Sequence, residues 1–511
     1  MFENGKICDT ILLCERFVLN KFAKFVFIKH VRGGTIMSNT SKASERIHAL
    51  LDDNSFVEIG ALVTARATDF NLAENQTPSD GVITGYGVID GNLVYVYSQD
   101  ASVMNGSVGE MHAKKITKLY DLAGKTGAPV IARIDSTGLR LQEATDALNA
   151  FGEIYMKQTL ASGVIPQITA VFGNCGGGLA IIPTLTDFTF MEEKSAKLFV
   201  NAPNALDGNT VAKCDSASAE FHATESGIVD VVAKEADLLA KIRELVALLP
   251  GNFEEEVLDE CEDDLNRACA ELENCKGDTA IALSQLSDNG VFFEIKEKYA
   301  PEMVTGFIKL NGMTVGAVAN RTEIVDEDGN VSKKMDAVLS VKGCYKAADF
   351  VRFCDAFNIP VLTLTNVKGY EATIGSEKGI ATAVAKLTHA FADATVPKVN
   401  VVIGDAFGSA YVAMNSKAIG ADIVMAWPDA QIGAMDATLA AKIMYDGKDA
   451  DTIKAKAEEY KALQTSVQSA ARRGYVDHIV EPADTRKYVI GAFEMLYAKV
   501  EDRPAKKHGT V

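Results

Sequence analysis

The stretch "VIPQITAVFGNCGG" at residues 164–177 has the pattern of a buried strand that ends in a glycine turn. A proline opens it, β-forming residues follow, and glycines close it. The stretch "TVPKVNVVIGDAFG" at residues 395–408 repeats this order 231 positions later. The same offset relates Pro129 to Pro360, which open the strand-like runs "APVIARI" and "IPVLTLT". Equal offsets at successive landmarks indicate a duplicated domain.

Each half of the repeat also contains a helix-compatible stretch between its two strands, at residues 152–163 and 379–395. Upstream, each half has a predicted hairpin whose turn is Asp90-Gly91 in the first half and Asn311-Gly312 in the second. Strand, helix and strand in succession are typical of a mostly parallel sheet. The sequence therefore predicts an α/β protein with one such sheet in each half.

Composition narrows the class of protein. A chain of 511 residues is too long to fold around one hydrophobic core, so two or more domains are expected. Its composition of 48% hydrophobic and 23% charged residues is typical of a soluble globular protein. The net charge of −18 argues against nucleic-acid binding. The nine cysteines lack the spacing of a zinc site, so we expect reduced cytosolic thiols and no metal. No run of residues reaches the length of a membrane span.

Four segments are expected along the chain. Residues 1–36 form a basic, apolar N-terminal extension, and our hypothesis is that Met37 is the true start. A cleaved targeting peptide or an amphipathic surface helix is the alternative. Residues 37–250 and 279–511 are the two domains. The acidic segment 251–278 is predicted to be a partly helical linker whose charges face solvent.

The glycines at 176–178 stand where a strand ends and a helix should begin. Backbone N–H groups at that place have no helical acceptor and lie at the positive end of the helix dipole, so they favour an anion. No Lys-Ser or Lys-Thr follows, which disfavours a phosphate loop. The segment "GDAFGSAY" at 404–411 occupies the equivalent turn, and each half has another glycine turn one strand earlier. This arrangement indicates paired amides that stabilise an oxyanion.

Many motifs in order resemble the carboxyltransferase subunits of biotin-dependent acyl-CoA carboxylases and decarboxylases. They include "GVITGYGVIDG", "GSVGEMHAKKI", "ASGVIPQI", "PTLTDFTFM", "GADIVMAWPDAQIGAM" and the closing "RPAKKHG". The resemblance runs from about Ser44 to the end. It implies two tandem crotonase-like (ClpP/crotonase) domains, each part of a duplicated ββα superhelix.

The resemblance also implies the reaction. A carboxyl group would move between carboxybiotin, carried on a separate biotin carboxyl carrier protein, and a short-chain acyl-CoA such as propionyl-CoA, methylmalonyl-CoA or acetyl-CoA. Enolates would be held in two oxyanion holes made of backbone amides. The assembly would be a cytoplasmic hexamer, a trimer of dimers with active sites at the dimer interface. The sequence shows no biotinylation motif and no ATP-binding loop, so a biotin carboxylase or a membrane decarboxylase subunit is the further expected partner.

Carried over residue by residue, the resemblance assigns two sites. The acyl-enolate hole would use the amides of Gly138 or Leu139 with Gly177 or Gly178. The biotin hole would use those of Gly369 or Tyr370 with Ser409 or Ala410, and Gly408 and Val412 would also line that site. Departures from the family pattern in "DSTGLR" and "VKGY" leave the acyl-CoA open and place Lys368 and Glu371 as new charges near the biotin site.

Three alternatives stay open from the sequence. The first is the alpha subunit of a sodium-pumping methylmalonyl-CoA or glutaconyl-CoA decarboxylase, bound at the membrane only through its partner. The second is a biotin-independent crotonase-type hydratase or isomerase, for which Glu143 is the candidate base. The third is a non-catalytic scaffold subunit.

Overall fold

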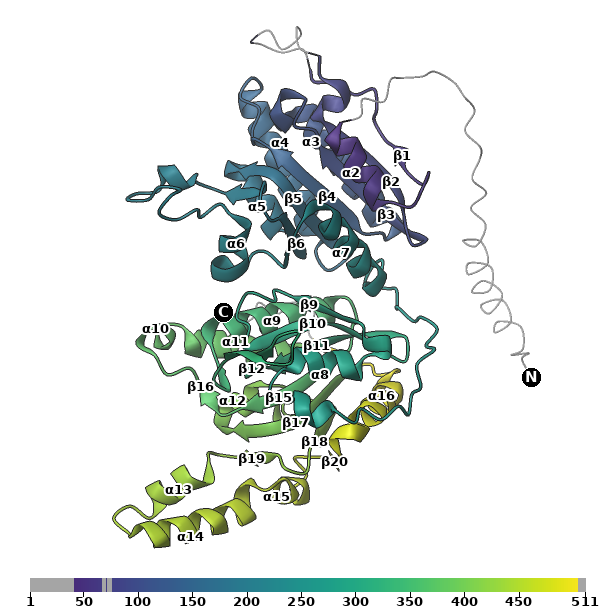
Figure 1. The fold of residues 1–511 in the computed structure, drawn as a ribbon. Coiled ribbons are helices and arrows are strands. Elements are labelled where there is room, and N and C mark those ends of the chain that lie inside the picture. The colour runs from purple at the N-terminus through teal and green to yellow at the C-terminus, as the bar shows by residue number, and fades with distance from the viewer. Residues whose placement is uncertain (1–40, 67–69, 71–75, 504–511) are drawn as a thin grey trace, which may run out of the picture. The chain divides into compact units, whose positions relative to one another are not determined.

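The computed structural model describes residues 41–66, 70 and 76–503, and these contain two eight-stranded sheets (Figure 1). The hypothesis about Met37 lies outside the described residues. The first sheet has the order β1-β2-β3-β4-β5-β6-β8, with β7 paired to β5. Its strands are β1 (Val57–Glu58), β2 (Val82–Ile89), β3 (Asn92–Gln99), β4 (Val130–Ser136), β5 (Gln167–Gly176), β6 (Phe188–Glu192), β7 (Lys197–Phe199) and β8 (Val231–Ala233).

The second sheet has the order β20-β18-β17-β15-β11-β10-β9, with β19 paired to β17. Its strands are β9 (Phe292–Ile295), β10 (Met303–Leu310), β11 (Met313–Asn320), β15 (Val361–Val367), β17 (Lys398–Phe407), β18 (Ile423–Ala426), β19 (Gln431–Gly433) and β20 (His478–Ile479). Two small two-stranded sheets pair β12 (Glu323–Val325) with β13 (Val331–Lys334), and β14 (Val338–Leu339) with β16 (Gly369–Tyr370).

The two sheets confirm the predicted repeat. Strands β15 and β17 begin and end 231 positions after β4 and β5. The hairpin β10–β11 follows β2–β3 by 221 positions, because the second half places the extra hairpin β12–β13 after β11. Both hairpins turn through two residues with positive φ, 49° and 85° at Asp90-Gly91 and 51° and 75° at Asn311-Gly312. The predicted turns are therefore confirmed.

Helices cover the sheets. In the first half they are α2 (Lys42–Leu50), α3 (Glu110–Thr126), α4 (Ala144–Ala161), α5 (Ile181–Thr184), α6 (Ala219–Phe221) and α7 (Glu235–Leu248). In the second half they are α8 (Thr279–Leu286), α9 (Val341–Ala356), α10 (Ile374–Glu377), α11 (Ile380–Asp393), α12 (Gly408–Ala413), α13 (Ala437–Met444), α14 (Ala450–Tyr460), α15 (Val467–Arg472) and α16 (Thr485–Leu496). The helices expected between the paired strands are α4 and α11.

Buried lysines on α3 and α9 show how closely the packing is duplicated. Lys115 and Lys346 are 231 positions apart, and each turns its ammonium group toward backbone carbonyls that precede a hairpin. Lys115 Nζ lies 3.0 Å from Ser79 O, and Lys346 Nζ lies 2.8 Å from Lys296 O and 2.9 Å from Tyr299 O. Burial lowers the pKa of Lys115 to about 8 and that of Lys346 to about 7.

Segment 251–278 is less helical than expected. Its helical part is one 3₁₀ turn, Leu272–Cys275, and the rest is irregular. Cys269 and Leu272 are buried with residues of the second sheet. The segment is thus attached to the second half through its apolar side chains, while Glu254 to Glu256 remain exposed.

One apolar core includes residues of both halves. Phe188 on β6 packs edge-to-face against Phe353 on α9, with ring centroids 4.7 Å apart, and against Phe307 on β10 at 6.1 Å. Among the described residues no helix is long and apolar enough to cross a membrane. Over the same ranges no group of three or more metal-ligating side chains gathers.

Candidate active site

The central strands of each sheet have the same irregularity just before the predicted glycine turns. The register shifts near the carboxyl ends of β4 and β5, and again near those of β15 and β17. At that point Gly173 packs against the Asp135 side chain and Gly404 against that of Asn366. A Cβ at the two glycines would lie 2.0 Å and 2.6 Å from a side-chain oxygen. Only glycine permits this approach, so each turn begins at the equivalent position of its strand.

In the first half the turn after β5 contains Gly177 and Gly178, which open the 3₁₀ turn Gly177–Ala180. Gly177 has φ +63°, and the space where its side chain would lie is open. The first amides of a helical turn have no acceptor within that turn, so they are available to a ligand. Tyr155 holds the turn from α4, because its hydroxyl donates to Gly178 O at 2.5 Å.

The turn after β4 lies directly beside this one. A side chain at Gly138 would approach Gly176 O to 3.0 Å, so the structure brings together both turns that the sequence assigned to the acyl site. The N–H of Gly138 donates to Ser136 Oγ at 3.1 Å. For Leu139, no acceptor is found for the N–H among the described residues. Of the two alternatives, Leu139 is therefore the available donor.

A fully buried ion cluster holds the residue that follows Leu139. Arg140 Nη1 donates to Asp80 Oδ1 at 2.6 Å and to Glu143 Oε1 at 2.8 Å, and all three side chains are inaccessible to solvent. Arg140 Nη2 donates to Ser107 O at 2.7 Å. Burial raises the pKa of Asp80, although Arg140 opposes that rise. The cluster therefore fixes the position of the turn after β4.

Glu143 has both carboxylate oxygens in use. Oε1 accepts from Arg140, and Oε2 accepts the N–H of Glu110 at 2.6 Å. The side chain is inaccessible to solvent and supports the turn. This geometry speaks against Glu143 as the base of a hydratase or isomerase.

In the second half the predicted residues gather around one cavity of about 480 Å³. It lies at the carboxyl ends of β15 and β17. Five of the predicted biotin-site residues line it, Gly369, Tyr370, Gly408, Ser409 and Ala410. Val412 does not line this cavity; it lies further along α12, with 37% of its surface exposed.

The wall of this cavity is ordered by contacts between its two turns. Tyr370 is on β16, which pairs with β14, and its hydroxyl donates to Ser409 Oγ at 2.7 Å. Gly408 opens α12 with φ +63°, the same value as Gly177, its counterpart 231 positions earlier. The amides that follow Gly408 begin a helix and therefore lack helical acceptors.

Charged and polar side chains complete the cavity. Lys368 Nζ lies 3.4 Å from Asp405 Oδ2, with 61% and 24% of the two side chains exposed, and Gln431 Nε2 donates to Asp405 Oδ1 at 3.5 Å. Sequence reasoning had noted Lys368 and missed Asp405, although it is in the repeated stretch. It also missed residues of the β19–α13 segment that line the cavity, Gln431, Ala434, Met435, Asp436 and Leu439. Gln431, Ala434 and Met435 fall within the motif "GADIVMAWPDAQIGAM", which indicates the family but does not assign these residues to the site.

Comparisons with known proteins agree with this architecture. The Carboxyl transferase domain model matches residues 38–511. A methylmalonyl-CoA decarboxylase subunit alpha from Propionigenium modestum is 40% identical over 99% of this chain and 98% of its own length. A propionyl-CoA carboxylase beta chain from Roseobacter denitrificans is 39% identical over 92% of this chain and 93% of its own.

Among solved structures, the hexameric transcarboxylase 12S core, with methylmalonyl-CoA and methylmalonic acid bound, superimposes with a TM-score of 0.85. It is 37% identical, and the match covers 92% of each chain. The expected fold of tandem crotonase-like domains is thereby confirmed. Fold, sequence and the duplicated turns lead to one conclusion: this chain belongs to the carboxyl transferase family and is a carboxyltransferase.

Proposed function

We propose that this chain moves a carboxyl group between biotin on a separate carrier protein and a short-chain acyl-CoA of the propionyl-CoA and methylmalonyl-CoA class. The observation that carries the proposal is the duplicated pair of turns. Gly177 and Gly408 share φ +63° at equivalent positions, and each follows a central strand beside a second turn. The names of the relatives and the ligand of the transcarboxylase structure support the choice of substrate class.

In this proposal the first-half turns stabilise the thioester oxygen as negative charge develops on it. The amide of Leu139 would act with that of Gly177 or Gly178. Such donors are effective because they are fixed before the reaction, and losing one typically costs about 10²–10³-fold in rate. The Arg140 cluster and Tyr155 keep the two turns in place.

The second-half cavity fits the neutral ureido ring of biotin. Its volume of about 480 Å³ suits a small ligand. The amides after Gly408 can donate to the ureido oxygen, and Asp405 can accept a ring N–H. Biotin supplies the carrier of the carboxyl group, and the chain binds and orients it. A carrier protein is therefore a required partner, with a biotin carboxylase or a membrane decarboxylase subunit beside it.

We also propose that the chain is cytoplasmic and forms a hexamer, which is the assembly of the transcarboxylase 12S core. In a trimer of dimers the acyl-CoA turns of one copy would face the biotin cavity of another. The alternative role as the alpha subunit of a sodium-pumping decarboxylase uses the same turns in the reverse direction. A membrane location would then come only through the partner.

One pair of variants at the helix start of the biotin cavity tests the proposal. Ser409→Pro removes a single N–H at a helix start, where proline is tolerated, and Ser409→Ala removes only the hydroxyl. With free biotin and methylmalonyl-CoA, we expect decarboxylation to fall about 10²–10³-fold in Ser409→Pro and far less in Ser409→Ala. Equal rates in the two variants would contradict an amide role.

Substrate and class are tested with the unmodified chain. Malonyl-CoA, methylmalonyl-CoA and glutaconyl-CoA are each incubated with and without free biotin. Biotin-dependent loss of carboxylate is expected, with methylmalonyl-CoA the fastest. Turnover without biotin would indicate a hydratase or isomerase, and no turnover of any thioester would indicate a scaffold subunit.

A further inference from the structure

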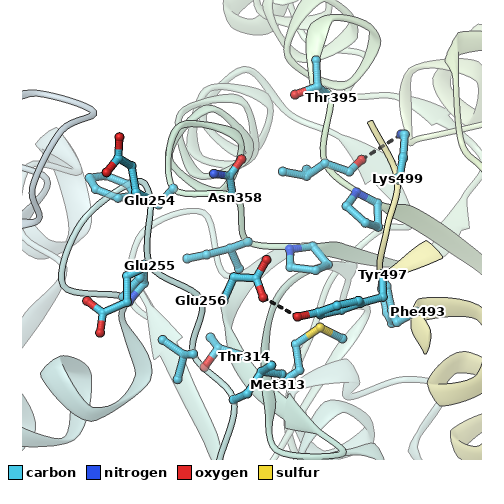
Figure 2. A pocket seen from close by; sticks show the side chains of 18 of the residues that line it. Glu254, Glu255, Glu256, Met313, Thr314, Asn358, Thr395, Phe493, Tyr497 and Lys499 are labelled. Carbon is cyan, nitrogen blue, oxygen red and sulfur yellow. Dashed lines mark hydrogen bonds between the residues drawn. The ribbon is translucent and has the colours of Figure 1, made fainter. Parts of the chain in front are cut away.

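The second half has another groove, of about 390 Å³, which Figure 2 shows from close by. Pro360 and Pro397, which immediately precede β15 and β17, line it. The predicted catalytic turns stand at the other ends of the same strands. The groove is therefore separate from the proposed reaction site.

The floor of the groove is apolar and its rim is acidic. Met313, Phe357 and Phe493 contribute to the floor. Glu254, Glu255 and Glu256 contribute three carboxylates to the rim. A fourth, Glu501, pairs with Lys499 at 3.3 Å, and Lys499 is the one cation among the residues that line the groove. That cation is already engaged, because its ammonium lies 2.9 Å from Asp422 Oδ2 and donates to Val396 O at 3.0 Å.

The rim is ordered from within the chain. Glu256 Oε2 accepts from the Tyr497 hydroxyl at 2.5 Å, as Figure 2 shows, and Glu255 Oε2 accepts the N–H of Gly251 at 3.0 Å. These bonds hold Glu255 and Glu256 on one side of the groove. For Glu254, no ion-pair partner is found among the described residues. An apolar floor with a fixed acidic side suits a short basic peptide.

This chain carries such a peptide next to the groove. Val500 and Glu501 line it, and the described chain ends at Arg503. Residues 504–511, "PAKKHGTV", follow directly and include Lys506 and Lys507. Eight residues span at most about 29 Å, which is enough to reach the acidic side.

We propose that segment 504–511 docks in this groove of its own chain, with Lys506 and Lys507 against Glu254 and Glu255. The contact joins the acidic segment between the two halves to the end of the chain. It gives a role to two charged stretches that lie outside the proposed oxyanion turns.

Hydrogen exchange of the full chain tests the docking. The comparison is with a variant truncated after Arg503 and with Lys506→Glu/Lys507→Glu. A segment docked about 90% of the time gives roughly tenfold protection of the amides it covers. We expect both variants to exchange roughly tenfold faster over residues 251–258, and 1 M salt to do the same to the unmodified chain. Lys333→Glu/Lys334→Glu, two adjacent exposed lysines on β13, is the matched control and should change nothing there.

Two further results decide the occupant. Adding Glu254→Lys to the double lysine variant should restore part of the protection. Carbodiimide cross-linking of mixed ¹⁵N-labelled and unlabelled chains should join Lys506 or Lys507 to Glu254 or Glu255 within single-isotope pairs. Unchanged exchange after truncation overturns the proposal, and mixed-isotope links overturn it in favour of the tail of a second copy.

Discussion

In both halves of this carboxyltransferase an aspartate accepts a backbone N–H at the start of a central strand. The two halves differ in whether a cation pairs with that aspartate. Asp187 accepts the N–H of Gln167 at 2.8 Å, and Asp422 accepts that of Lys398 at 2.8 Å. Lys499 pairs with Asp422 at 2.9 Å, whereas among the described residues no cation pairs with Asp187. Burial accordingly raises the pKa of Asp187 to about 7.

The next strand repeats the difference. Asp230 accepts the N–H of Thr189 at 2.6 Å, and Asp477 accepts that of Val424 at 2.9 Å. Lys417 pairs with Asp477. For Asp230, burial raises the pKa to about 6 even though distant lysines oppose that rise. Duplication has thus preserved the hydrogen bonds that define the fold, while the ion pairs around them have diverged.

The largest expected difference between the halves concerns the turns after β4 and β15. Arg140→Met leaves Asp80 and Glu143 buried without their cation, which typically costs about 3–5 kcal/mol. Lys368→Met breaks an exposed pair with Asp405 and should cost about 0–1 kcal/mol. Urea unfolding measures the loss of stability in each variant, and hydrogen exchange measured separately for each half shows where the loss occurs. Similar losses would show that the buried cluster is not what distinguishes the two turns.

The second prediction concerns pH. Because the pKa of Asp187 is raised above its ordinary value, its contribution to stability is fully present below about pH 4 and is lost as the pH rises toward 7. The total loss is on the order of a few kcal/mol. Asp187→Asn keeps an acceptor for Gln167 and removes the ionisation. We therefore expect the variant to gain stability relative to the unmodified chain between pH 5 and pH 8.

Local probes separate this effect from changes in the second half. Amide exchange along β5, corrected for intrinsic rate, reports on the first half. The chain has one tryptophan, Trp427, buried in the second half, and its fluorescence reports there. Asp422→Asn, which removes one of the two carboxylates that pair with Lys499, is the contrasting variant and should not show the same gain. An equal gain in stability in Asp187→Asn and Asp422→Asn would show that the ion pair with Lys499 does not distinguish the two halves.

The sequence was enough to predict the repeated strands and the features that depend on neighbouring residues. The offset of 231 located the central strands, and Asp90-Gly91 located a hairpin, because turns and strand periodicity depend on neighbouring residues. The cluster of Arg140 with Asp80 joins residues 60 positions apart, and such pairings leave no periodic signal. Similarly, the segment from Gln431 to Leu439 lines the proposed biotin cavity only because β19 pairs with β17.

The smallest expected effect concerns what the halves share. Gly177 and Gly408 both have φ +63°, which costs an L-residue about 1–2 kcal/mol. A Cβ would meet open space at Gly177 and an ordinary 3.4 Å contact with Ala434 O at Gly408, so neither site adds a clash. Gly177→Ala and Gly408→Ala should therefore destabilise their own halves equally, as measured by exchange along β5 and β17. A clear inequality would mean that the turns have diverged in backbone strain as well as in surrounding charge. In that case the two proposed oxyanion sites could no longer be treated as copies of one geometry.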